Sequence, residues 1–161
     1  MVIELLQVQW VLNGGRCGVC GDAWTDDSSS EAGDHEVGGR FFSGIVVRRY
    51  VAGQLVLVIV QLTAAHRGYF EFRLCPATNN DQEVTQECLD RHLLTMSDGR
   101  RTRYIVEADA PSLHQLTLRL PQQLTCRRCL LQWKYHSGRS LDQRWATFYV
   151  ARRPPDSLFI F

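Results

Sequence analysis

Cysteine is the residue that most constrains how this chain can fold. The sequence of 161 residues has six, at Cys17, Cys20, Cys75, Cys88, Cys126 and Cys129. An even number predicts disulfides in an oxidising compartment, whereas two C-x-x-C pairs in the cytosol would suggest zinc. Zinc ribbons usually hold their two pairs about 15–20 residues apart. Here the two pairs lie far apart in the chain, and a zinc site would leave the two central cysteines unexplained. We therefore favour disulfides, without a pairing for the C-x-x-C cysteines.

Short apolar segments separated by turn residues predict β-strands. The segment 55–60 is a continuous β-branched and leucine run, as in a buried strand, and segment 69–74 alternates large apolar with polar side chains. The expected strands are 44–51, 54–63, 69–74, 103–106, 116–120, 130–135 and, as a seventh candidate, 145–150. One helical turn is expected around 86–94, and the first forty residues are rich in turn signals. The pattern indicates an all-β sandwich with long loops, forming one domain over residues 1–161.

Charge and hydropathy argue against two classes of partner. The formal net charge is +1, and the arginines are scattered along the chain, so we expect no nucleic-acid partner. The run 55–60 is far shorter than the roughly 20 residues of a membrane helix, so we expect no membrane partner. The first ten residues have no basic region and no cleavage site typical of a signal peptide. The cysteines nevertheless favour an extracellular, secreted protein, and we give them more weight.

A series of ordered motifs resembles the animal-type lytic polysaccharide monooxygenases, whose domain is also called a chitin-binding type-4 domain. The motifs span residues 9–138, and residues 139–161 form a divergent tail. They are Trp10-x-x-Asn13-Gly14-Gly15-Arg16-Cys17-Gly18-Val19-Cys20-Gly21-Asp22-Ala23-Trp24, His35-Glu36-Val37-Gly38-Gly39, Leu62-Thr63-Ala64-Ala65-His66-Arg67-Gly68-Tyr69-Phe70-Glu71-Phe72, Leu74-Cys75-Pro76, Cys88-Leu89-Asp90 and Leu124-Thr125-Cys126-x-x-Cys129-Leu130-Leu131-Gln132-Trp133-x-Tyr135.

The resemblance implies an immunoglobulin-like or fibronectin-like β-sandwich with a flat surface that meets chitin, cellulose or another β-1,4-linked polysaccharide. It also implies a copper cofactor held by a histidine brace, in which an N-terminal histidine and a second histidine supply nitrogen ligands suited to copper. His66 matches the second brace histidine and is our metal-ligand prediction, although Ala65 stands where the family more often has asparagine. Cys75 and Cys88 lie at the ends of one excursion between strands, so we expect them to form a disulfide, and we expect a monomer.

Both ends of the chain depart from the family pattern. The sequence begins at Met1, and no histidine precedes His35, which belongs to a loop motif without a ligand role. His92, His114 and His136 match no ligand position. After Gly138 the family's cysteine-rich segment and its axial aromatic residue have no counterpart. We therefore expect the chain, as its sequence stands, to be catalytically silent, and we assign no catalytic residue.

Two alternatives remain open at this stage. The chain could be a non-catalytic extracellular module that coats chitin, with Trp24, Tyr50 or Tyr69 stacking on sugar rings. It could also be a fragment with no function of its own. Copper dependence separates the first alternative from an oxidising enzyme, and cooperative unfolding tests the second.

Overall fold

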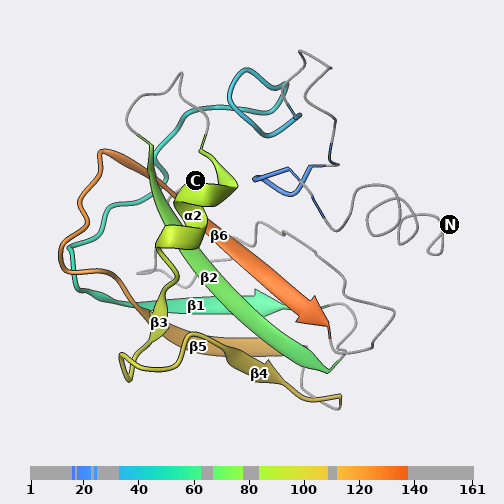
Figure 1. The fold of residues 1–161 in the computed structure, drawn as a ribbon, viewed down its shortest axis with the longest axis vertical. Helices are drawn as coiled ribbons and strands as arrows, with labels where there is room; N and C mark the ends of the chain where they lie inside the picture. The colour runs from blue at the N-terminus through green and yellow to red at the C-terminus, as the bar shows by residue number, and fades with distance from the viewer. Residues whose placement is uncertain are drawn as a thin grey trace, which may run out of the picture.

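The computed structural model describes residues 16, 18–22, 24, 33–62, 67–77, 84–108 and 112–137. Two antiparallel sheets face each other (Figure 1). The first sheet has the order β1-β5-β3 and the second the order β4-β2-β6. The strands are β1 (Leu55–Gln61), β2 (Gly68–Ala77), β3 (Thr95–Met96), β4 (Tyr104–Val106), β5 (Leu113–Arg119) and β6 (Arg128–Ser137). The predicted β-sandwich is therefore confirmed.

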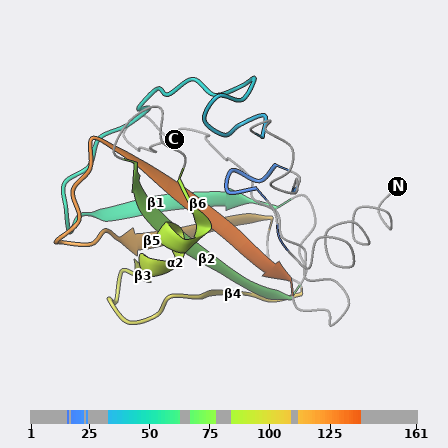
Figure 2. The ribbon, with the colours of Figure 1, turned by 45° about the horizontal axis from the view of Figure 1, so that its top comes forward.

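The core lies between the sheets because alternate side chains of each strand point inward. Val56, Val58 and Val60 of β1 are buried, while Phe70 and Phe72 of β2 face them from the second sheet. The strands of one sheet run across those of the other in both views (Figures 1 and 2). The prediction of a strand within 54–63 is thus confirmed, and its inward face is the even-numbered one.

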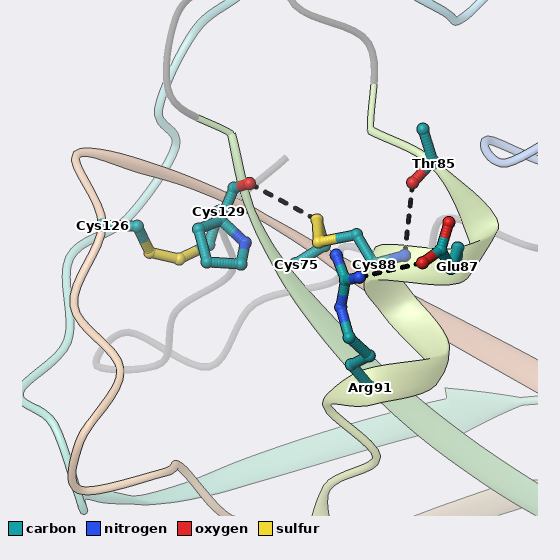
Figure 3. The surroundings of a disulfide bond; sticks show 8 residues. Cys75, Thr85, Glu87, Cys88, Arg91, Cys126 and Cys129 are labelled. Carbon is teal, nitrogen blue, oxygen red and sulfur yellow. Dashed lines mark hydrogen bonds and ion pairs between the residues drawn. A yellow bond between two sulfur atoms is a disulfide. The ribbon is translucent and has the colours of Figure 1, made fainter.

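A short helix, α2 (Gln86–Arg91), covers the outer side of the second sheet (Figure 2). The Thr85 side chain caps it by accepting a hydrogen bond from the Cys88 amide, at 3.2 Å. Leu89 is fully buried and joins Cys75, Ala77 and Val84 in a second, smaller apolar cluster. The expected helical turn is confirmed, and so is the Cys75–Cys88 disulfide that fastens it to β2 (Figure 3).

One predicted strand is wrong. Within the described residues, segment 44–51 belongs to neither sheet, although its side chains alternate as in a strand. Ile45, Val47 and Val51 are exposed, whereas Val46, Arg48 and Tyr50 are partly buried. The local sequence favours extended backbone, but a strand also needs a neighbouring backbone to pair with, and the sequence does not contain that information. The candidate strand 145–150 lies outside the described residues.

His114 is an unusual member of the core. It is 2% exposed, its ring meets Phe70 and Tyr104 edge-on, and its Nε2 has no hydrogen-bond partner within the part of the chain that the structure describes. Burial lowers the pKa of His114 below its ordinary value. The folded protein therefore takes up a proton at His114 less readily than the unfolded chain does.

We expect the stability contributed by a neutral His114 to be complete above about pH 6.5, the ordinary histidine pKa, and to fall as the pH drops below it. His114→Phe should flatten this part of the profile and raise the free energy of unfolding at pH 7 by about 1 kcal/mol, because a buried polar atom without a partner is removed. Urea unfolding between pH 5 and pH 8 measures both effects. His92→Phe, at a partly exposed position, is the control, and an unchanged pH profile in His114→Phe would contradict the prediction.

Candidate functional site

The site predicted from the sequence lies at one end of the sandwich, where the chain crosses between the sheets. β1 ends at Gln61, and the Leu62 amide donates a 2.7 Å hydrogen bond to the Ser112 carbonyl. β2 then begins at Gly68, which pairs with Val106 of β4 and with Ser137 of β6. His66 falls in the connection between these points and lies outside the described residues. The structure therefore describes the strand ends that flank His66 but not the imidazole itself.

A buried carboxylate organises the face of the second sheet next to this connection. Glu71 is 4% exposed, although it lies on the outer side of β2. Its Oε2 accepts a 2.8 Å hydrogen bond from Arg73 Nη2, and its Oε1 accepts one of 3.1 Å from Arg103 Nε. His136 Nε2 lies 3.0 Å from Oε2. We call Glu71, Arg73, Arg103 and His136 the Glu71 cluster.

The cluster extends in two directions. Arg73 Nε lies 3.0 Å from Asp90 Oδ1, which ties the cluster to α2. The Tyr69 ring stacks on the His136 ring with 4.4 Å between centroids, and the Arg103 guanidinium lies 4.4 Å from the centroid of the same tyrosine ring. His136 lies in β6, and Arg103 directly precedes β4, so the Tyr69 ring has contacts from both neighbours of β2. The guanidinium, phenol and imidazole groups thus form one connected set.

The charges in the cluster follow from burial and from the paired arginines. Burial on its own would raise the pKa of Glu71, but the hydrogen bonds from Arg73 and Arg103 outweigh it and hold the pKa below its ordinary value. Burial lowers the pKa of His136, and the nearby Glu71 only partly opposes this. At neutral pH the cluster therefore contains an ionised Glu71, two guanidinium groups and a neutral imidazole. The ionised Glu71 carboxylate is thus the group that the other three side chains of the cluster contact.

Four of the five histidines lie within the described residues. His35 Nδ1 lies 2.7 Å from Asp22 Oδ1, and the His35 amide donates to Oδ2 of the same carboxylate at 2.8 Å, which closes a loop. His92 ends α2, and His114 and His136 lie in strands β5 and β6. Across the described ranges, no three histidine, cysteine, aspartate or glutamate side chains form a group that could hold a metal ion.

The second C-x-x-C pair forms a disulfide between Cys126 and Cys129 (Figure 3). These two thiols are thus unavailable as zinc ligands, which removes the four-cysteine zinc site considered from the sequence. Cys20 is buried, and Cys17 lies outside the described residues, so the pairing of the first C-x-x-C pair stays open. Disulfides of this kind fit an extracellular protein.

Each of the three aromatic residues considered for sugar stacking contacts neighbouring side chains. Arg16 lies over the Trp24 ring at 4.7 Å from its centroid, and Tyr50 packs against the main core. Tyr69 stacks on His136 and lies beside the Arg103 guanidinium. All three residues are only partly exposed.

Comparison with known proteins decides the family. The family model described as "lytic polysaccharide mono-oxygenase, cellulose-degrading" matches residues 6–150. This chain belongs to the lytic polysaccharide monooxygenases. A solved structure of the AA15 lytic polysaccharide monooxygenase from Thermobia domestica, in the Cu(I) state, superposes on it with a TM-score of 0.74 and 41% sequence identity. The match covers 83% of this chain and 67% of that one. No curated protein sequence matches the chain.

The Glu71 cluster is the feature that sequence reasoning missed. The alternation in 69–73 placed Tyr69, Glu71 and Arg73 on one face, which we read as the polar side of a strand. A glutamate and an arginine two residues apart on a strand are neighbours on the same face. This spacing was the one feature of the sequence that could have predicted the Glu71–Arg73 ion pair. Burial of that face by α2 and the contact from Arg103, which directly precedes β4, were not visible in the sequence.

Among the described residues, no helix is long and apolar enough to cross a membrane.

Proposed function

We propose that this chain is a secreted, monomeric, single-domain protein that binds a β-1,4-linked polysaccharide, chitin before cellulose. The family match over residues 6–150 is the observation that carries this proposal. The 41% identity to an AA15 monooxygenase and the two disulfides of the described residues support it. The polysaccharide would meet the chain at the end of the sandwich where β1 passes into β2.

His66 is the residue we propose as the internal copper ligand of this chain. A brace also requires a histidine at the amino terminus of the mature protein, and no histidine precedes His35 in residues 1–161. A polypeptide that begins at Met1 would keep a single imidazole at this site and would lose the chelate that holds copper. We therefore propose that such a polypeptide binds polysaccharide without oxidising it, which is the role of a non-catalytic chitin-binding module.

Amino-terminal sequencing and intact mass of the protein isolated from its native source test this proposal first. A mature chain that begins with histidine should release oxidised oligosaccharides from chitin when copper and a reductant are supplied. His66→Ala should reduce that release to background, whereas His92→Ala, at the end of α2, should leave it unchanged. A mature chain that begins at Met1 should sediment with chitin and release no oxidised product.

Two results would overturn the proposal. Copper-dependent oxidation of chitin by a polypeptide that begins at Met1, abolished by His66→Ala, would show that the chain makes its copper centre in another way. A folded protein that sediments with neither chitin nor cellulose would remove the polysaccharide partner.

A further inference from the structure

The extended segment 44–51 has main-chain groups that no strand pairs with. Its side chains alternate between exposed and partly buried from Ile45 to Val51, as in a β-strand, yet it belongs to neither sheet. The Ile45 amide donates to the Ser43 hydroxyl at 3.4 Å. The Val51 amide donates to Gln54 Oε1 at 2.9 Å. The amides and carbonyls between these two residues make no hydrogen bond with any residue that the structure describes. The segment therefore resembles an edge strand that lacks its neighbour.

The segment is nevertheless held in place. Its inward side chains, Val46, Arg48 and Tyr50, line an apolar cavity of about 270 Å³, and Tyr50 also packs against the main core. The turn that follows closes with a 3.1 Å hydrogen bond from the Gln54 amide to the Val51 carbonyl. In both views the segment runs beside the one that leads into β6 and then joins the start of β1 (Figures 1 and 2). Because it is anchored, the segment has little conformational freedom to lose when it binds a partner.

The outward side chains define what could lie beside the segment. Ile45, Val47 and Val51 are 61%, 52% and 73% exposed, and the exposed Arg49 lies between the last two. Across neighbouring strands, aliphatic side chains are favoured opposite aliphatic ones, and a cation is favoured opposite a carboxylate. The outward face thus suits three aliphatic partners and one acidic partner.

The charge around the segment is one-sided. Residues 37–70 and 110–141 contain no aspartate or glutamate, although the whole chain has 17. Arg49 and Arg127 are both exposed and line the same cavity, and neither forms an ion pair with the described residues. The surface along the segment is therefore positively charged and complements a negatively charged partner.

We propose that segment 44–51 binds an extended, acidic segment of another polypeptide, which adds to it as an antiparallel strand. Unpaired amides and carbonyls at strand spacing are satisfied together by another extended backbone, and this makes the partner a polypeptide rather than a polysaccharide or a lipid. Its side chains opposite the three exposed aliphatic residues are aliphatic, and its side chain opposite Arg49 is a carboxylate. The segment joins β1 at Leu55, whereas His66 follows the other end of that strand, so the partner leaves the predicted polysaccharide end open.

A synthetic peptide of the sequence Val-Thr-Glu-Thr-Val-Thr-Ile, blocked at both ends, tests the proposal by calorimetry with the full chain. In the antiparallel register its glutamate lies opposite Arg49. We expect saturable 1:1 binding, and about tenfold weaker binding when lysine replaces the glutamate, because two cations then meet. The same peptide with all its amides N-methylated should not bind, since it has no main-chain donors. No saturable binding of the first peptide would overturn the proposal, and so would equal binding of the N-methylated one.

Reversal of one charge locates the binding. Arg49→Glu should lose affinity for the glutamate peptide about tenfold and gain it for the lysine peptide, whereas Arg100→Glu, at an exposed turn, should change neither. Thermal unfolding of both variants verifies that they fold. Unchanged binding of both peptides to Arg49→Glu would place the peptide elsewhere and overturn the proposal.

Two further measurements separate this proposal from others. Sedimentation velocity should show a monomer with and without the peptide, and a dimer that the peptide dissociates would replace the proposed partner with a second copy of the chain. Sedimentation with chitin should be the same with and without the peptide. Loss of chitin binding upon addition of the peptide would contradict the separate position of the two sites.

Discussion

Phe70→Ala is expected to reduce the free energy of unfolding by about 4 kcal/mol, the typical loss when a buried phenylalanine is truncated. Phe70 is fully buried in β2, and its ring meets four other rings edge-on or stacked. These are the rings of Tyr104, His114, Trp133 and Tyr135, with centroids between 5.1 and 5.7 Å away. They come from three other strands and from both sheets, so no neighbour can move into the space without disturbing the rest. Because domains of this size are stable by only about 5–15 kcal/mol, a large share of the total would be lost.

Urea unfolding at pH 7 measures this loss, and the chain offers a matched control. Phe41 is 55% exposed, so Phe41→Ala makes the same chemical change outside the core. We expect that variant to change the free energy of unfolding by less than about 1 kcal/mol. A loss in Phe70→Ala no larger than that in Phe41→Ala would mean that the two sheets do not pack around Phe70 in solution.

Glu71→Ala is the second substitution with a large expected effect, about 3–5 kcal/mol, because it leaves buried charges without their partner. Arg73 and His136 are each only 14% exposed in their side chains, and both lie within 3.0 Å of the Glu71 carboxylate. Arg103 would lose its 3.1 Å contact and with it part of its position over Tyr69. We expect the contacts among Arg103, Tyr69 and His136 to loosen as stability is lost.

The control for this variant is Glu87→Ala on α2. Glu87 also pairs with an arginine, Arg91, at 2.9 Å, but both side chains are exposed. Exposed pairs of this kind contribute well under 1 kcal/mol, so Glu87→Ala should leave stability nearly unchanged. Equal losses in the two variants would contradict the view that burial gives the Glu71 cluster its energy.

The pH profile distinguishes the charge of Glu71 from its packing. Because its pKa is lower in the folded protein, Glu71 contributes stability that is complete above the ordinary carboxyl pKa and is lost as the pH falls through the folded value. Glu71→Gln retains the shape of the side chain and should remove this acid-side dependence. A wild-type and a Glu71→Gln profile that run parallel below pH 5 would contradict it.

Much of the fold was predictable because local patterns determine it. A continuous β-branched run located β1, and alternation of apolar and polar side chains located β2. Five of the six strands and the helical turn at α2 were predicted in this way from short apolar segments and the turn residues between them. The ordered motifs identified the family, and the positions of Cys75 and Cys88 at the ends of one excursion predicted their disulfide. These features depend on residues that are neighbours in sequence or that stand in a motif, so the chain itself contains the information.

Only the tertiary structure decided the features that depend on partners distant in the chain. The extended segment 44–51 has the pattern of a strand but pairs with neither sheet among the described residues. Glu71 carries the pattern of an exposed residue, yet α2, Arg103 and His136 surround it from other elements. The Cys126–Cys129 bond excluded the zinc alternative that spacing had left open, and the apolar cavity beside Tyr50 exists only because two sheets and two loops meet there. Local propensity determines the conformation and faces of a segment, whereas burial and pairing depend on what the rest of the chain places against it.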